Sequence, residues 1–307
     1  MNPLIERLGW TLLHSLWQGT LAWAFLRVAL PLLRRYSAQA RYLAACGALV
    51  LASAAPWITF FQIDVTERLS AAVPSHASTS PEPTLAQPVS SARPAAVAPS
   101  PPPPARRVGS GDFGAVLRPA FPWLVGLWLI GFGGSCLRLL LGWQQTRRLA
   151  RGPLTPPPAE LAARFASLLA RLRFHRTVRI GLSACVPGPA VVGWLRPIVL
   201  LPIEALAGLT PGQIDAVLIH ELAHIRRADF LVNLLQAVTE ALFFYHPAVH
   251  AINRVIREER EHACDDLAVK LTGDPVGYAR ALAALATHAG PPLALAATGA
   301  DGSGGLI

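Results

Sequence analysis

The chain has 307 residues, of which 52% are hydrophobic and only 15% are charged. A soluble domain typically carries about 25% charged residues, so this composition and a mean hydropathy of +0.40 predict membrane spans. The net charge is +9 and comes almost entirely from arginine, because Lys270 is the only lysine. The four cysteines are widely spaced without a CxxC motif, which predicts free thiols and gives no support to a disulfide or thiolate-zinc framework.

Three apolar segments are long enough to cross a bilayer, which takes about 20 residues. The predicted spans are 8–33, 42–63 and 121–143, with Trp and Phe gathered near their ends as interfacial anchors. The first segment lacks a basic region before its apolar run, so we expect a retained span and not a cleaved signal peptide. Residues 1–63 are therefore expected to form two transmembrane helices joined by a short loop.

Two polar residues interrupt the first span. His14 and Gln18 are four residues apart and share one helical face. Polar groups inside a span normally hydrogen-bond to neighbouring helices, so we expect that role here, with a functional role as the alternative.

Arginines flank the spans unequally. Three lie between the first and second spans and three follow the third: Arg34, Arg35 and Arg41, then Arg147, Arg148 and Arg151. The positive-inside rule then places the N-terminus outside, and the first loop and everything after the third span in the cytoplasm. This topology accounts for the basic charge without nucleic acid, for which no recognised binding module is present.

Residues 64–120 have a different composition from the spans. They are rich in Pro, Ala and Ser and lack apolar periodicity, so we expect a disordered extracytoplasmic linker. After the third span, residues 150–290 are expected to form a cytoplasmic domain, and 291–307 a flexible tail. The fold class is thus a mostly helical membrane protein with three transmembrane helices and an α+β domain that contains a small sheet.

The cytoplasmic domain has a readable order of elements. Residues 158–174 predict an amphipathic helix, and the stretches VRIGLSACV and AVVGWLRPIVLLP predict short strands. The next helix has Thr210 as N-cap and Pro211 as its first residue, and runs through His224. Further helices are expected at 230–245, at 248–271 and from the break at Gly273 to about 288.

The stretch LIHELAHIRRADF holds the main chemical signal. His220 and His224 lie one turn apart on one helical face, so both imidazoles can reach a single zinc ion. A catalytic zinc site keeps three protein ligands and an open position. Glu221 can serve as the general base that takes a proton from the attacking water and returns it to the leaving amine.

The third ligand must come from elsewhere in the chain. The downstream candidates are Asp229, Glu240, His246, His250, Glu258, Glu259, Glu261, His262 and Asp265. The densest set is REEREHACDD at 257–266, where Glu258, Glu261 and Asp265 share one helical face. Spacing alone leaves the choice open between Glu258 and Glu261, and a solvated charged helix face is the alternative for the whole run.

Several spaced motifs carry a family resemblance. VPGPAVVGWLRPIVLLP, HELAHIRRAD, FFYHPAVHAINRVIREEREHACDD and the N-terminal LLHSLWQGT resemble the BlaR/MecR-type antirepressor signal-transducer membrane zinc metallopeptidases. The resemblance implies a gluzincin-like site in which Glu261 is the third zinc ligand and Asp265, four residues later, supports it. Asp229 would also be supportive, and the strand near 190–193 would accept an extended substrate segment.

The expected function follows from the site and the resemblance together. We expect a multi-pass protein of a bacterial-type inner or cell membrane: a zinc endopeptidase that cleaves itself or a cytoplasmic, repressor-like regulator. Antibiotic sensing is not expected, because it needs a Ser-x-x-Lys motif and the only lysine is not part of one. The alternatives are an HtpX-type or CAAX-type membrane protease and a non-catalytic scaffold with a structural metal. A site-2-type intramembrane protease is disfavoured by the charged flanks of the motif helix.

Overall fold

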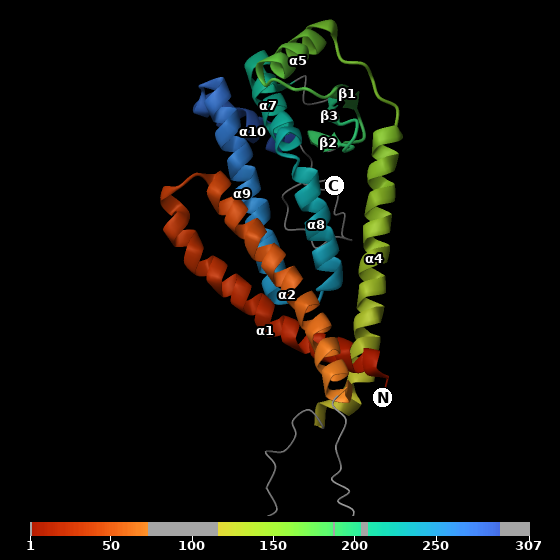
Figure 1. Ribbon diagram of the computed structural model, residues 1–307. Helices are drawn as coiled ribbons and strands as arrows, with labels where there is room; N and C mark the ends of the chain where they lie inside the picture. The colour runs from red at the N-terminus through yellow and green to blue at the C-terminus, as the bar shows by residue number, and fades with distance from the viewer. Residues whose placement is uncertain (1, 73–115, 187, 204–207, 289–307) are drawn as a thin grey trace, which may run out of the picture.

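The computed structural model describes residues 2–72, 116–186, 188–203 and 208–288 (Figure 1). Within these ranges three helices are long and apolar enough to cross a membrane: α1 (Pro3–Leu32), α2 (Ala38–Ala72) and α4 (Phe121–Arg151). Short 3-10 turns at Leu33–Arg35 and Arg118–Ala120 adjoin α1 and α4. The apolar stretches Pro3–Arg35, Ala38–Ile63 and Arg118–Arg148 contain the three predicted spans. The expectation of three candidate spans is therefore confirmed.

Helix α2 ends later than its apolar stretch. It continues from Ile63 to Ala72, into residues expected to begin the linker. No Gly or Pro interrupts this extension, so the helical hydrogen bonding has no local reason to stop at 63. The expected linker between 73 and 115 and the expected tail at 291–307 lie outside the described residues.

A small mixed sheet and a covering helix precede the motif helix. Strand β3 (Ile198–Pro202) lies in the middle, parallel to β1 (Arg179–Ser183) and antiparallel to β2 (Ala190–Val192). Helix α5 (Ala159–Arg171) turns its apolar face inward and its arginines outward, as the sequence predicts. This confirms the expected combination of helices with a small sheet.

Four long helices follow the sheet within residues 208–288, which the structure describes. Helix α7 (Pro211–Arg227) begins with a capping box in which the Thr210 and Gln213 side chains each bond the other's backbone N–H. It ends at Arg227, three residues beyond His224, and its C-cap Ala228 has a φ of 55°, in the left-handed region. Helices α8 (Asp229–Leu242), α9 (Pro247–Thr272) and α10 (Pro275–His288) complete the described chain.

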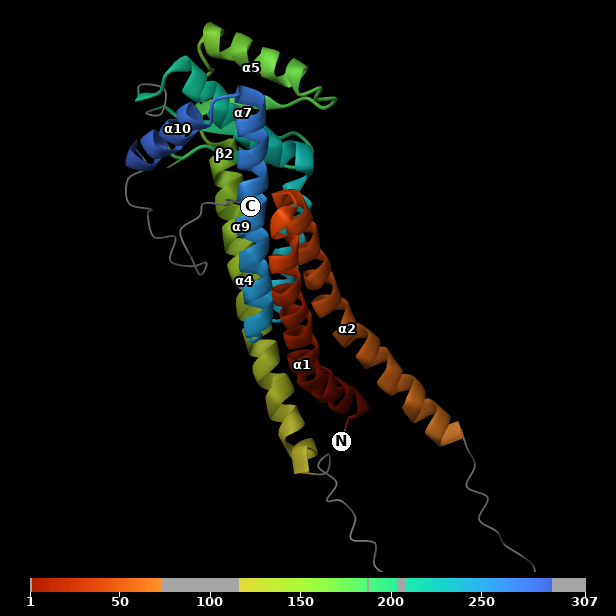
Figure 2. The same cartoon turned by 90° about the vertical axis from the view of Figure 1, so that its left-hand side faces the viewer.

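Among the described residues, the two larger buried clusters organise the molecule, and a smaller third one lies at Val186, Val192 and Leu200. We call the first the sheet-side core; its main members come from α5, the sheet and α7: Leu161, Phe165, Leu182, Val199, Leu201, Leu218 and Leu222. The second, the bundle core, joins α1 and α2 to α8 and α9 through Leu26, Tyr42, Leu49, Phe243, Val249, Ile252 and Ile256. In Figures 1 and 2 the sheet, α5, α7 and α10 occupy one end, and α8 and most of α9 run back along the candidate spans.

Helix α1 contacts the joint between α8 and α9. His246 caps α9, and its Nε2 is 3.0 Å from the backbone oxygen of Ser15. The Ser15 hydroxyl also bonds the Tyr245 hydroxyl at 2.8 Å. Gly19 lies directly against the imidazole, since a Cβ there would overlap Nε2 of His246. The packing thus brings together two motifs, LLHSLWQGT and FFYHP, that are far apart in the sequence.

The polar residues of α1 make mainly structural contacts. Gln18 donates from Nε2 to the Thr59 hydroxyl of α2 at 2.7 Å, which is the helix–helix role expected for it. His14 instead bonds the Trp10 carbonyl of its own helix through Nδ1 at 2.8 Å. Its expected contact with a neighbouring helix is therefore replaced by an intrahelical one.

Candidate metal centre

Three potential metal ligands converge between α7 and α9. His220 and His224 extend from one face of α7 and their Nε2 atoms are 3.2 Å apart. From α9, Oε2 of Glu261 lies 3.5 Å from Nε2 of His220 and 3.6 Å from Nε2 of His224. The three donor atoms are close enough to hold one ion. Two nitrogen donors and one carboxylate are a set that zinc accepts.

Each histidine is held from behind by a carboxylate. Nδ1 of His220 is 3.1 Å from Oδ1 of Asp265, which lies one turn beyond Glu261 on α9. Nδ1 of His224 is 2.9 Å from Oδ2 of Asp229, the first residue of α8. A carboxylate at Nδ1 fixes the ring orientation and directs Nε2 toward a metal. The donor set and its support therefore fit a metal ion.

The other acidic and histidine candidates have different neighbours. Glu258 is exposed on α9, so the structure brings Glu261 and not Glu258 to the two histidines. Glu259 pairs with Arg41 and Glu240 with Arg257. The remaining histidines also bond elsewhere: His246 to Ser15, His250 to the Phe244 carbonyl, and His262 within 3.8 Å of Glu259.

Two residues of the site escaped the sequence analysis. The Tyr278 hydroxyl on α10 donates to Asp265 at 2.5 Å and lies 2.9 Å from Nδ1 of His220. Arg260 is buried and donates from Nε to Oε1 of Glu261 at 3.2 Å. Neither belongs to a recognisable ligand pattern. Arg260 could have been suspected as a charge beside Glu261, but nothing local in the sequence marks Tyr278.

The electrostatics of the group favour an ionised Glu261. Burial opposes ionisation, but hydrogen bonds from His220 and His224 hold the pKa of Glu261 well below its usual range. Burial also acts against charge on the histidines, yet Asp265 and Glu261 raise the pKa of His220 to about 9. Asp229, Cys264 and Glu261 likewise raise the pKa of His224 to about 12. The carboxylates thus create a strongly cation-attracting site, where a metal and protons compete for the imidazoles.

Glu221 is electrostatically distinct from Glu261. It follows His220 on α7, and burial raises the pKa of its carboxyl while the two histidines act in the opposite direction. A carboxylate with a raised pKa is a better proton acceptor than an ordinary one.

Cys264 forms a second compact group with His224 and Asp229. Its sulfur is 3.4 Å from Nδ1 of His224 and 3.8 Å from Oδ2 of Asp229. Burial raises the pKa of this thiol, and the neutral thiol is a poor metal ligand. This group is therefore better suited to orienting His224 than to binding a second metal ion. All four cysteines are free, as predicted.

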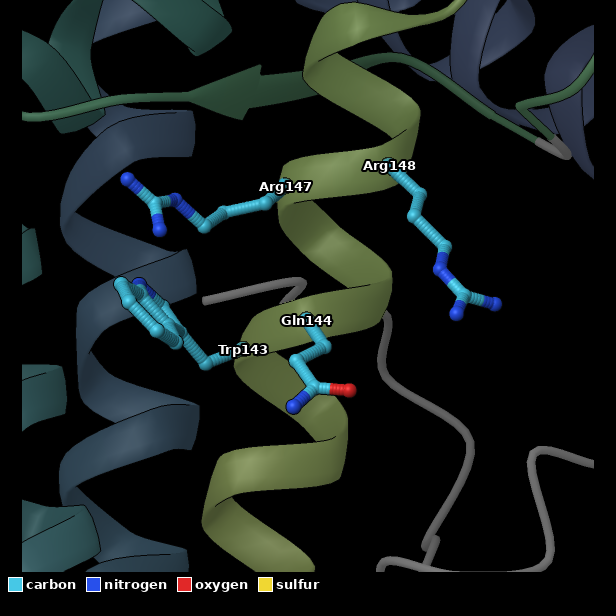
Figure 3. Close-up of a pocket in the computed structure, with 4 residues that line it drawn as sticks. All are labelled: Trp143, Gln144, Arg147 and Arg148. Atoms are coloured by element: carbon cyan, nitrogen blue, oxygen red, sulfur yellow. The ribbon is translucent and has the colours of Figure 1, made fainter.

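A separate hollow of about 520 Å³ lies on α4, lined by Trp143, Gln144, Arg147 and Arg148 (Figure 3). The Arg147 guanidinium carbon is 4.2 Å from the centre of the Trp143 ring. These residues stand at the end of a candidate span and belong to a different helix from every ligand of the metal centre. An aromatic ring stacked with arginine is a common anchor at a membrane interface.

The comparison with known protein families extends over most of the chain. The family described as BlaR1 peptidase M56 matches residues 19–302, which include both metal-centre helices. The chain belongs to this family. Members are metallopeptidases, so the M56 match agrees with the metal-ligand geometry and confirms the predicted resemblance. The expectation of a membrane protein of the BlaR/MecR type is met at this level.

Individual relatives are distant. Over 144 residues the chain is 24% identical to the regulatory protein BlaR1 of Bacillus licheniformis, a match that covers 47% of this chain and 24% of the relative. Over 102 residues it is 24% identical to the methicillin resistance mecR1 protein of Staphylococcus aureus, covering 33% of this chain and 17% of the relative. The matched part thus spans about a quarter or less of these M56 relatives.

Proposed function

We propose that the chain is a zinc-dependent membrane endopeptidase. In this proposal His220, His224 and Glu261 hold the ion, and Glu221 is the general base. The observation that carries it is the convergence of the three donor atoms, with a carboxylate behind each imidazole. Membership in the M56 family supports a peptidase chemistry for this arrangement.

The chain's own residues supply proton transfer and orientation. Zinc, when bound, contributes Lewis-acid activation of water and of the scissile carbonyl. Glu221 takes the proton of the attacking water and delivers it to the leaving amine. Asp265 and Asp229 keep the imidazoles of His220 and His224 in the tautomer that leaves Nε2 available. Arg260 holds Glu261 in position through its second carboxylate oxygen.

The substrate segment would bind in an extended form. Strand β2 pairs with β3 on one side only and lies against α7, so its other edge offers backbone groups for β-augmentation. Exposed Trp194 and Leu195 follow this strand, and the Trp194 ring lies tilted against Phe230 with ring centres 5.8 Å apart. We infer that these side chains contact apolar residues of the substrate.

The proposed biological role is signal transduction by proteolysis. The relatives are named as a regulatory protein and a methicillin resistance protein. By this analogy the substrate is the chain itself or a cytoplasmic repressor-like regulator, with the peptidase end of the molecule in the cytoplasm at the inner membrane face. The M56 match favours this role over an HtpX-type or CAAX-type processing protease. Glu221 beside the ligands favours an enzyme over a scaffold, because a structural metal site needs no general base.

The experiment uses the full chain purified in detergent. Zinc content and cleavage of itself, of co-expressed cytoplasmic proteins and of a labelled unfolded protein are compared for wild type and Glu221→Ala. We expect zinc to stay and cleavage to fall by about 10²–10⁴-fold, the usual contribution of a general base. Equal cleavage by the two proteins contradicts the catalytic role.

A matched pair on one helix tests the third ligand. Glu261→Ala is expected to lose zinc, whereas Glu258→Ala, an exposed position on the same helix, is expected to keep it. The reverse result would transfer the ligand role to Glu258.

A further inference from the structure

The start of α2 reaches the metal centre. Tyr42 lies near the N-terminal end of this candidate span and is only 4% exposed. Its hydroxyl donates to Oδ1 of Asp229 at 3.3 Å, while Oδ2 of the same carboxylate holds Nδ1 of His224 at 2.9 Å. One side chain of a span is therefore two hydrogen bonds away from a proposed zinc ligand.

Arg227 completes the connection between α2 and Asp229. Its Nε donates to Oδ1 of Asp229 at 3.3 Å, and its guanidinium carbon lies 4.5 Å from the centre of the Tyr42 ring. Its Nη1 also donates to Oε1 of Gln39, in the first turn of α2, at 2.5 Å. The Asp229 carboxylate thus contacts the His224 imidazole and two donors. One donor, Tyr42, belongs to α2, and the other, Arg227, is hydrogen-bonded to Gln39 of α2.

A second contact ties the same turn of α2 to α9. Nε of Arg41 pairs with Glu259 at 2.8 Å, two residues before Glu261. The first turn of α2 therefore holds both helices that carry the proposed zinc ligands. The two 3.3 Å contacts to Asp229 are long for hydrogen bonds. A displacement of α2 relative to α7 changes the Tyr42 contact directly, and it acts on the Arg227 contact through Gln39 and the Tyr42 ring.

We propose that Tyr42 is a positioning residue for His224, acting through Asp229, and that the N-terminal end of span α2 is thereby part of the metal centre. This inference rests on the proposed zinc site. Tyr42 contacts neither metal nor substrate; it orients the carboxylate that orients the ligand. Movement of the span then alters zinc affinity and turnover without any change in the ligands themselves.

The test is a double-mutant cycle in the full chain in detergent. The rate of zinc transfer to a chelator is measured for wild type, Tyr42→Phe, Asp229→Ala and the double variant. Loss of a partner behind a metal-binding histidine typically costs 10–100-fold in metal affinity, which we expect for Asp229→Ala. Tyr42→Phe keeps the ring and is expected to release zinc about 3–10-fold faster. In the Asp229→Ala background, where the Tyr42 hydroxyl has lost its acceptor, the same change is expected to have no further effect.

A spectroscopic readout separates positioning from general loosening. In the cobalt-substituted protein the visible absorption reports ligand geometry, and we expect Tyr42→Phe to change it while the thermal unfolding midpoint stays close to that of wild type. Tyr36→Phe is the matched control, because Tyr36 is 65% exposed just before α2. It is expected to leave zinc release and the spectrum unchanged.

Several outcomes would overturn the inference. Unchanged zinc release in Tyr42→Phe contradicts it, and so does an equal effect in the presence and absence of the Asp229 carboxylate, because Tyr42 would then act independently. Zinc retention is measured without substrate. A chain that holds zinc but cleaves independently of Glu221 contradicts only the proposed function. Zinc release that is unchanged in Tyr42→Phe contradicts only this inference.

Discussion

The sheet-side core and the bundle core contain the same kinds of side chain but lie beneath different surfaces. Helix α5 buries Leu161, Phe165 and Leu168 and turns arginines outward, which is the pattern of a helix facing water. Around the bundle core, α1, α2 and α4 expose large apolar side chains such as Phe25, Trp57 and Ile130. Helix α8 does the same with Leu231 and Leu234. Burial from water can therefore stabilise the first core, whereas packing must supply more of the stability of the second.

Helix α9 joins the two cores. Its first half places Val249, Ile252 and Ile256 in the bundle core, and its second half places Ala268 in the sheet-side core. Glu261 lies between these halves and faces α7. Residues 150–290 were expected to form a cytoplasmic domain, yet α8 and the first half of α9 share a core with the candidate spans. The proposed metal centre thus lies at the boundary between the two regions.

Matched truncations should show the largest difference between the cores. Leu222 and Ile252 are both fully buried, one in each core. We expect Leu222→Ala to lower the free energy of unfolding by about 2–5 kcal/mol, because it loses both transfer from water and packing. Ile252→Ala should cost less, about 1–2 kcal/mol, because lipid is as apolar as the core and mainly packing is lost. Unfolding in detergent measures both, and equal costs would contradict the assignment of different surroundings.

Metal removal should affect the two regions unequally. At free zinc 100 times its Kd, binding stabilises the native protein by about 2.7 kcal/mol, which a chelator removes. Hydrogen exchange is expected to rise in α7 and the second half of α9, while the contact between α1 and α2 keeps its protection. Loss of protection spread evenly over both cores would mean that the metal stabilises the whole molecule as one unit.

A glycine substitution should disturb the bundle at the joint between α8 and α9. A Cβ at Gly19 would overlap the His246 ring, so we expect Gly19→Ala to cost about 1–3 kcal/mol through overpacking. Gly47→Ala on α2 is the control, because nothing lies within 4 Å of its Cβ position. Thermal unfolding midpoints in detergent compare the two. A Gly19→Ala protein as stable as Gly47→Ala would show that this contact is loose.

The smallest expected effect comes from a polar contact within the bundle. Gln18 bonds Thr59 across α1 and α2. Hydrogen bonds between membrane helices contribute about 0.6 kcal/mol on average, so a double-mutant cycle of Gln18→Leu and Thr59→Val should give a coupling energy of that size. Thr20→Val is the control, because it removes a side-chain hydrogen bond that lies within α1 and does not join two helices. A coupling energy above about 2 kcal/mol would point to a role for Gln18 beyond helix association.

Much of the local structure could be predicted because it depends on short spacing. The apolar runs are long enough to indicate three candidate spans, and the Thr210-Pro211 pair marks the start of α7. Helical periodicity puts His220 and His224 on one face, and it relates Glu261 to Asp265 in the same way. The choice between Glu258 and Glu261 needed either the family resemblance or the structure, because both residues fit the spacing.

Local sequence is enough to predict most of the helices, their apolar stretches and which side chains share a helix face, since backbone hydrogen bonding and side-chain periodicity act over a few residues. Which helix faces meet depends instead on tertiary packing. It brought Tyr278 to His220, Tyr42 to Asp229, and Ser15 and Gly19 to His246. These contacts depend on side-chain packing between helices that are far apart in the sequence, where shape and depth select the partner and no short motif records it.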